Sequence, residues 1–407
     1  MDLQPQLGVF RVDSANTKTR DEWSLSTILD GLISMNPTVH LNHFQRQWRS
    51  VRSAVLSAVD AVGNSGRLIL GEKVTHFEEA LAARTGVKHV IGCANGLDAI
   101  EISLRALGLK QGERVLTTPL SAFATTLAIL RVGGVPVFVD VDNTGLLNLD
   151  AAEEILADQN HRIGFLLPVH LFGHAMELQK LAALKKRFAL ELVEDCAQAI
   201  SATSEGVPVG TIGDMAALSF YPTKNLGCMG DGGAVLTSDD RLAAAARALR
   251  DYGQTGKYTH AYLGMNSRLD EIQAAILLEA LLPRLATFTQ RRRHIARQYR
   301  ENITSAALTI PEVPRGSDSV YHLFPVLVQD NRESFREHLR TRSIESAVHY
   351  PVLIPDQPAM RGEKFEVADS LVNARRFTDR EVSLPIHPYL TEEDIARVID
   401  ACNTWDA

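Results

Sequence analysis

Residues 219–235 read "SFYPTKNLGCMGDGGAV" and place a lysine, Lys224, between two apolar runs. The first run is typical of a buried strand, and the glycine-rich turn after the lysine leads into a second strand-like run. An isolated ammonium group is costly to bury, and burial lowers its pKa. The pattern therefore indicates either a paired structural lysine or an amine that is neutral often enough to attack a carbonyl.

Strand-like and helical segments alternate upstream of this lysine. The runs "RVLTTP", "VPVFVDV" and "IGFLLPVHL" are apolar, and each is followed by a helical segment such as "FATTLAILRVG". This alternation is typical of a mostly parallel sheet with helices on both faces. We therefore predict an α/β fold, with this block spanning about residues 65–255.

The chain of 407 residues is long enough for more than one domain. Residues 1–39 are polar and weakly patterned, and we predict an extension there. We predict a large domain over residues 40–280, which includes an N-terminal helical segment, and a smaller α+β domain over residues 281–407. The long helical stretch that joins them is expected to bend or break at Pro283.

Composition argues against several kinds of partner. The net charge of −7 gives no electrostatic footprint for nucleic acid, and no run of about 18 apolar residues indicates a membrane-spanning helix. The four cysteines lie apart, as reduced thiols of a cytoplasmic protein do. The pair His170 and His174 has the spacing of zinc ligands but lacks the glutamate of a zinc-protease motif, so we predict no metal.

Four features fall just after strands, where doubly wound sheets bind ligands. The turn at Asn95 and Gly96 offers backbone N–H groups at a helix start, which suit a phosphate. Phe123 opens a helix, where it either packs in the core or stacks on a planar ligand. Glu194 and Asp195 end an apolar strand, so one of them is either a solvated strand end or an acid that pairs with a cationic ring nitrogen.

Lys224 is the fourth feature. Phosphate cradle, aromatic face, acid and amine follow one another in chain order, each directly after a strand. Pyridoxal phosphate needs this set, because it forms an imine with a lysine, protonates at its ring nitrogen, stacks on a face and carries a phosphate. We therefore predict that the chain binds pyridoxal phosphate.

The sequence resembles the DegT/StrS-type sugar aminotransferases, which are pyridoxal phosphate enzymes with the aspartate-aminotransferase fold. The resemblance spans about residues 40–402. It rests on the motifs "ANGLDAI", "PVHLFG", "VEDCAQAI", "GDMAALSFYPTKNLGCMGDGGAV", "GKYTHAYLGMNSRLDEIQAAIL", "HYPVLIPDQPAM" and "SLPIHPYLTEEDIARVI". Among these enzymes it looks most like the nucleotide-sugar 3-aminotransferases.

The resemblance implies a role for each matching residue. Lys224 would hold the cofactor as an aldimine, Asp195 would pair with the pyridine nitrogen and Gln198 would reach the phenolic oxygen. Phe123 would stack on the ring. The phosphate would be held by Asn95, Gly96, Leu97 and Ser219, with Asn266 arriving from the partner subunit of a homodimer. The expected substrate-binding residues are Tyr221, Tyr258, His260 and His322. Many relatives have threonine where this chain has Leu97, so phosphate anchoring would rely more on Ser219 and the turn.

The function that the resemblance implies is transfer of an amino group from glutamate to a nucleotide-linked keto-deoxysugar, by a ping-pong cycle. The "GLDA" motif with Leu97, together with Tyr221, favours carbon 3 of a 3-keto-6-deoxyhexose, although Tyr221 could simply pack under the cofactor. Two alternatives stay within the family, a 4-keto-sugar aminotransferase and a cyclitol aminotransferase. A third is a non-catalytic regulator that binds pyridoxal phosphate. We also expect a homodimer, because the helix from "NSRLDEIQAAILLEALL" is apolar on much of its circumference.

Overall fold

The computed structural model describes residues 37–158 and 160–406, and residues Val39–Ala407 form one compact unit. The extension predicted for residues 1–39 lies almost entirely outside the described residues. The division into a large domain over residues 40–280 and a smaller one over 281–407 stays a prediction.

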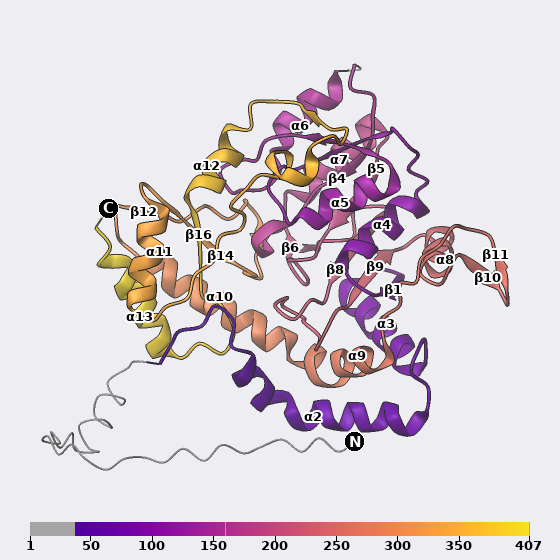
Figure 1. Ribbon diagram of the computed structural model, residues 1–407, viewed down its shortest axis with the longest axis horizontal. Helices are drawn as coiled ribbons and strands as arrows, with labels where there is room; N and C mark the ends of the chain where they lie inside the picture. Colours follow the sequence, from indigo (N-terminus) through magenta and orange to yellow (C-terminus); the bar gives the residue numbers. More distant parts are fainter. Residues whose placement is uncertain (1–36, 159, 407) are drawn as a thin grey trace, which may run out of the picture. The chain divides into compact units, whose positions relative to one another are not determined.

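An eight-stranded sheet forms the centre of this unit (Figure 1). Only β9 runs against the other strands, because it pairs antiparallel with both of its neighbours while the remaining pairs are parallel. The order across the sheet is β1 (His89–Cys93), β9 (Gly233–Thr237), β8 (Met215–Ser219), β5 (Glu191–Asp195), β4 (Ile163–Leu167), β2 (Arg114–Thr117), β3 (Val135–Phe138) and β15 (Glu366–Val367). The mostly parallel α/β sheet predicted from the alternating pattern is therefore confirmed.

Both faces of the sheet are buried. Successive residues Val90 and Ile91 of β1 enter two different hydrophobic clusters, and Ala216 and Ala217 of β8 do the same. Side chains alternate across a strand, so each face has its own layer of helices. The helices of the sheet region are α3 (Glu72–Thr85), α4 (Gly96–Ala106), α5 (Phe123–Val132), α6 (Leu149–Ala157), α7 (Leu178–Phe188) and α8 (Asp240–Leu249).

The long helical stretch after the sheet is interrupted near Pro283, as predicted. It consists of α9 (Glu271–Ala275), a π-helical turn η2 (Ile276–Leu281), a 3₁₀ turn η3 (Leu282–Arg284) and α10 (Leu285–Asn302). Ile276 and Leu277 are buried in one cluster with residues of α3 and of α2 (Phe44–Ser65). Helices of the same chain cover this apolar face (Figure 1), so the apolar circumference does not by itself require a partner subunit, and the homodimer stays a prediction.

The same stretch, Glu271–Asn302, is the one helical segment among the described residues that is long and apolar enough in composition to cross a membrane. Half of the most apolar 18-residue part of this segment is buried inside the fold, and a helix in the core of a globular domain can have the same length and composition. Length and composition alone are therefore weak grounds for a membrane span here.

A second, antiparallel sheet lies in the C-terminal part of the chain. It contains β12 (Leu308–Thr309), β14 (Phe324–Val328) and β16 (Glu381–Leu384). Residues of α10, α11 (Arg332–Thr341) and α13 (Glu392–Asn403) share one hydrophobic cluster with it. The remaining elements are η1 (Leu171–Gly173), β6 (Thr203–Ser204), β7 (Val207–Pro208), β10 (Gln254–Gly256), β11 (Thr259–His260), β13 (Ser317–Asp318), η4 (Ile354–Asp356), η5 (Pro358–Met360) and α12 (Val372–Arg380).

Candidate active site

The turn between β1 and α4 forms a close-packed cradle. Asn95 caps the helix, and its Oδ1 accepts a 2.8 Å hydrogen bond from the backbone N–H of Asp98. Gly96 and Leu97 follow, with the backbone N–H groups that a helix start leaves without an intrahelical partner. A β carbon on Gly96 would lie 2.7 Å from the Cβ of Ser219, so only glycine fits there. These groups can bind a phosphate.

Asp195 ends β5 as a buried carboxylate. Its Oδ2 accepts a 2.8 Å hydrogen bond from the Thr125 hydroxyl, and its Oδ1 accepts a 3.0 Å bond from the Ala197 N–H. Burial raises the pKa of Asp195, although these bonds and the charge of Lys224 act in the opposite direction. A carboxylate in this position gains most from a cationic partner such as a protonated ring nitrogen. Thr125 carries no signal in the sequence that would have marked it.

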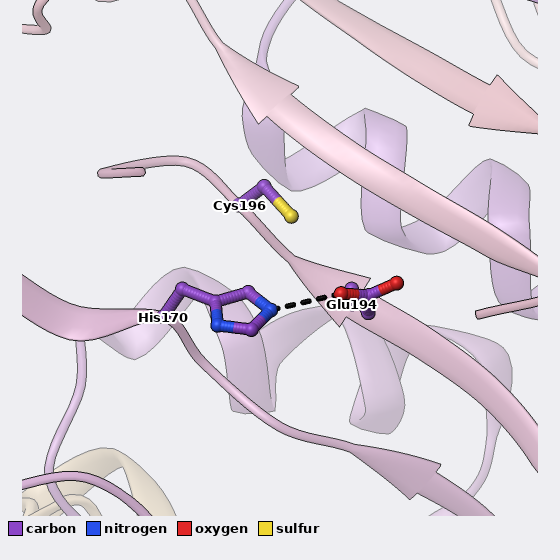
Figure 2. A group of neighbouring side chains, drawn as sticks. All are labelled: His170, Glu194 and Cys196. Atoms are coloured by element: carbon purple, nitrogen blue, oxygen red, sulfur yellow. Dashed lines mark hydrogen bonds and ion pairs between the residues drawn. The ribbon is translucent and has the colours of Figure 1, made fainter. Parts of the chain in front are cut away.

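Glu194 points toward His170, and Figure 2 shows the bond between the two side chains. It forms a buried 2.9 Å bond with Nε2 of His170. It also accepts backbone N–H bonds from residues 210, 212 and 213, and the hydrogen bond from His170 and these backbone bonds hold its pKa below its usual range despite burial. Strand alternation puts the two carboxylates on opposite faces of the sheet, which leaves Asp195 as the candidate acid of the site. Its role stays a prediction.

The ligand atoms of His170, Glu194 and Cys196 lie within 4.8 Å of one another. Both ring nitrogens of His170 are already used, because Nδ1 accepts the N–H of Met176 at 3.1 Å while Nε2 bonds to Glu194. His174 bonds instead to the Ser319 hydroxyl at 2.7 Å. Hydrogen bonds therefore account for the positions of His170, His174 and Glu194.

Lys224 lies in the turn that follows β8 and is half-buried. Burial lowers its pKa from 10.5 to about 8, and the charge of Asp195 limits the decrease. An amine with this pKa is neutral in a substantial fraction of molecules near pH 8 and can attack a carbonyl. The reactive lysine predicted from residues 219–235 therefore has both a depressed pKa and an acid close enough to influence it.

Phe123 is the first residue of α5 and is partly buried against Phe138 and Ile354. Gln198 is held at both ends of its side chain. Its Oε1 accepts a 2.8 Å bond from the Phe172 N–H, and its Nε2 donates to the Tyr350 hydroxyl at 3.2 Å. One hydrogen of Nε2 remains for another acceptor. The stacking role of Phe123 and the phenolic contact of Gln198 stay predictions.

Of the four expected substrate-binding residues, His322 is buried close enough to Lys224 to feel its charge. Burial is the main cause, and the charge of Lys224 the next, that holds the pKa of His322 well below its usual range. His349, which sequence reasoning missed, shows the same effect, with a pKa of about 4. Tyr221 is half exposed.

Tyr258, His260 and Asn266 lie in an exposed region around the β10–β11 hairpin. His260 bonds to the carbonyl of Tyr252 at 2.9 Å, and Asn266 pairs through its backbone with Asp251. None of these bonds reaches Lys224 or Asp195. The roles predicted for these three residues need a second subunit, and they stay predictions.

Known proteins are similar to this chain over most of its length. A pleiotropic regulatory protein of Geobacillus stearothermophilus is 38% identical over 87% of this chain and 95% of its own. A UDP-N-acetyl-3-dehydro-alpha-D-glucosamine 3-aminotransferase of Acidithiobacillus ferrooxidans is 36% identical over 90% of this chain and 97% of its own. The crystal structure of Streptomyces venezuelae DesV in complex with a ketimine intermediate superposes with a TM-score of 0.86, at 38% identity over 91% of this chain and 99% of that one.

The sequence pattern of a known family matches residues 50–403, which include the cradle, Asp195 and Lys224. The resemblance drawn from the motifs is therefore confirmed over nearly all of the described chain: it belongs to the DegT/DnrJ/EryC1/StrS aminotransferase family.

Proposed function

We propose that this aminotransferase moves an amino group from glutamate to carbon 3 of a nucleotide-linked keto-deoxysugar, by a ping-pong cycle. The observation that carries the reaction type is Lys224, an amine with a pKa of about 8 near the buried acid Asp195. The substrate is proposed by analogy with the relative from Acidithiobacillus ferrooxidans, whose name gives carbon 3 of a nucleotide-linked keto sugar as the site of amination.

The enzymes of this family depend on pyridoxal phosphate. The residues of this chain fit that cofactor, because the cradle at Gly96 leaves room for no side chain and Asp195 is a buried carboxylate to which no cationic side chain of the described residues is hydrogen-bonded. When bound, the cofactor supplies an electron sink for the bond that breaks at the α carbon of the amino acid.

The chain's own residues then divide the work. Lys224, once its amine is free, would remove the proton from the α carbon of the amino acid. The same amine would then deliver a proton to the carbon that carries the aldehyde of the cofactor. Asp195 keeps the ring nitrogen protonated, and each pKa unit of that support corresponds to about 1.4 kcal/mol. Gly96, Leu97 and Ser219 hold the phosphate, so that the bond to be broken stays aligned with the base.

We also propose a cytoplasmic homodimer with shared active sites, which acts on small molecules without nucleic acid or membrane partners. Exposed apolar side chains around the β10–β11 hairpin support the dimer. Leu263 is 93% exposed and Tyr258 is 83% exposed, in the same region as Asn266. Large apolar side chains gathered in this way are typical of surfaces that a partner covers.

The test is to convert the purified protein to its pyridoxamine form and offer the 3-keto and 4-keto isomers of one nucleotide-linked 6-deoxyhexose. Return of the pyridoxal absorbance with the 3-keto isomer, and an amine located at carbon 3 by NMR, is the expected result. Amination only at carbon 4, or only of a free cyclitol, would overturn the proposed substrate. A protein that binds the cofactor but reacts with no amino acid would be a regulator instead.

A further inference from the structure

A cavity adjoins the reactive lysine, and the cofactor contacts described above do not account for it. It is lined by the residue before the lysine, Thr223, and by Asn42, Arg292, His322 and His349, with apolar side chains such as Ile386 completing the wall. The lining comes from four separate parts of the chain: the segment before α2, the turn after β8, helix α10 and the C-terminal region. A site assembled in this way is not visible from the local sequence.

Arg292 is a buried cation in this wall, with only 5% of its surface exposed. Its Nη1 donates to the carbonyl oxygens of Tyr321, His322 and Ile386 at 3.1 to 3.3 Å. Its Nε has no hydrogen-bond partner among the described residues, and neither does its Nη2. Burial lowers its pKa only to about 10, so the guanidinium remains charged near neutral pH.

No carboxylate of the described residues forms an ion pair with Arg292. A buried charge without a counter-ion is costly, so proteins rarely keep one unless a ligand supplies the opposite charge. The free Nε–H and Nη2–H lie side by side on one edge of the guanidinium. That edge matches the two oxygens of a carboxylate in a bidentate pair.

The other polar groups of the wall are neutral. Asn225 donates its amide N–H to the carbonyl of Val320 at 3.0 Å, so its Oδ1 accepts the Nδ1–H of His322 and leaves the Nε2 of that ring without a proton. Burial and the charge of Lys224 hold His349 neutral as well. The hydroxyl of Thr223 and the amide of Asn42 have no partner among the described residues. The cavity therefore offers one fixed positive charge with uncharged hydrogen-bonding groups around it.

We propose that Arg292 binds a carboxylate of the amino-acid donor, with Thr223 and Asn42 as additional hydrogen-bond donors. This inference rests on the proposed function, because it names the site that the donor occupies in the first half of the cycle. The donor brings a carboxylate on the reacting carbon, and glutamate brings a second one at the end of its side chain. A nucleotide sugar carries its negative charge on the diphosphate, away from the ring carbon that reacts, so it gains less from Arg292.

The test follows the two half-reactions separately by absorbance, in holoenzyme with Arg292→Lys. Lysine keeps the charge but loses the two-pronged edge. The glutamate concentration that gives half-maximal conversion to the pyridoxamine form should rise about 10- to 100-fold. The reverse half-reaction, driven by the aminated nucleotide sugar, should change less than about threefold. Arg293→Lys, on the next residue of α10, is the matched control, since Arg293 bonds to the Ser319 carbonyl and pairs with Asp318 instead.

Equal losses in both half-reactions, or unchanged glutamate saturation, would overturn the inference. Because Nη1 of Arg292 also holds three carbonyls, a second measurement compares two amino donors within each protein, so that a general loss of activity in the variant cancels. Alanine lacks the side-chain carboxylate of glutamate, and 4-aminobutyrate lacks the one on the reacting carbon. If Arg292 binds the carboxylate on the reacting carbon, alanine should saturate the unaltered enzyme at a lower concentration than 4-aminobutyrate; if it binds the other carboxylate, the order should be reversed. In either case the difference between the two donors should shrink in the Arg292→Lys variant. An unaltered enzyme that converts with no amino acid would contradict the proposed function rather than the role of Arg292.

Discussion

Gly96, at the start of α4, and Ser219, at the end of β8, approach so closely that a β carbon on the glycine would lie 2.7 Å from the serine Cβ. The contact joins two segments that are more than a hundred residues apart in the sequence. It brings the free N–H groups of a helix start beside a hydroxyl, and this pair is the base of the proposed phosphate site.

A methyl group at residue 96 should therefore weaken cofactor binding. We expect Gly96→Ala to raise the dissociation constant for pyridoxal phosphate at least tenfold, because the helix start must move away from Ser219. Equilibrium dialysis or absorbance titration of the apoprotein measures it. Gly63→Ala in α2 is the control, since a β carbon there meets no atom within 4 Å. Equal affinities of the two variants would mean that the phosphate binds elsewhere.

The depressed pKa of Lys224 predicts how fast the apoprotein captures its cofactor. Only the neutral amine attacks the aldehyde, so the rate should rise about tenfold per pH unit below pH 8 and level off above it. Stopped-flow absorbance follows the reaction, and borohydride should then attach the cofactor permanently to this residue. Lys224→Ala should abolish turnover. A capture rate that keeps rising up to pH 10 would show that the amine is not depressed.

The central sheet and the reactive lysine could be predicted from the sequence because both have local signatures. Apolar runs alternate with helical segments, and a lysine between two such runs is unusual in itself. Strand β15 could not be predicted, since its two residues, Glu366 and Val367, pair with β3 from more than 200 residues away. The apolar circumference of η2 could not identify its packing partner for a related reason. Periodicity shows that a helix is buried, but it does not show whether α2 or another subunit buries it.

The polar partners of the site were harder still to predict. Asp195 stands at the end of an apolar strand and is visible in the sequence. Thr125, which donates to it, is one of many threonines and is selected only by the packing of α5 against β5. Arg292 lies in an arginine-rich helix whose pattern is typical of a solvated face, and only the tertiary structure separates it from its partly exposed neighbours Arg291 and Arg293.

Removal of the charge of Asp195 should affect chemistry more than folding. Asp195→Asn nearly conserves volume, so the melting temperature of the holoenzyme should stay within a few degrees. Turnover should fall at least 100-fold, because the amide no longer keeps the ring nitrogen protonated, at about 1.4 kcal/mol for each pKa unit lost. The pKa of Lys224 should also fall in the apoprotein, because the charge of Asp195 raises it. Turnover within threefold of the unaltered enzyme would remove Asp195 from the mechanism.

Glu381 predicts a pH dependence of stability. Burial raises its pKa to about 8, from an ordinary value of 4.5. Between these values the unfolded chain releases its proton while the folded protein keeps it, so the free energy of unfolding decreases as pH rises, by at most about 1.4 kcal/mol per unit. Glu381→Gln keeps an acceptor for the His349 N–H and lacks this proton.

Urea denaturation of both proteins at pH 5 and at pH 8 checks this. The variant should gain stability relative to the unaltered protein on going from pH 5 to pH 8, because other titrating groups contribute equally to both. A constant difference across that range would show that Glu381 is already ionised in the folded state at pH 5.

The proposed sharing of active sites gives the last prediction. Asn266 is exposed and forms no bond to the groups around Lys224 in its own chain, so we expect it to act on the cofactor phosphate of a second subunit. Lys224→Ala and Asn266→Asp should each be inactive as homodimers, the second because a carboxylate repels the phosphate. When the two variants are unfolded together and refolded, about half of the dimers should be mixed. One of the two sites in each mixed dimer then combines an intact lysine with an intact asparagine. Activity should return to roughly a quarter of that of the unaltered enzyme. If Asn266 served its own chain, every site in the mixture would lack one of the two residues and no activity would return. Refolded Lys224→Ala mixed with unaltered enzyme is the control for losses on refolding, and sedimentation at assay concentration confirms the dimer.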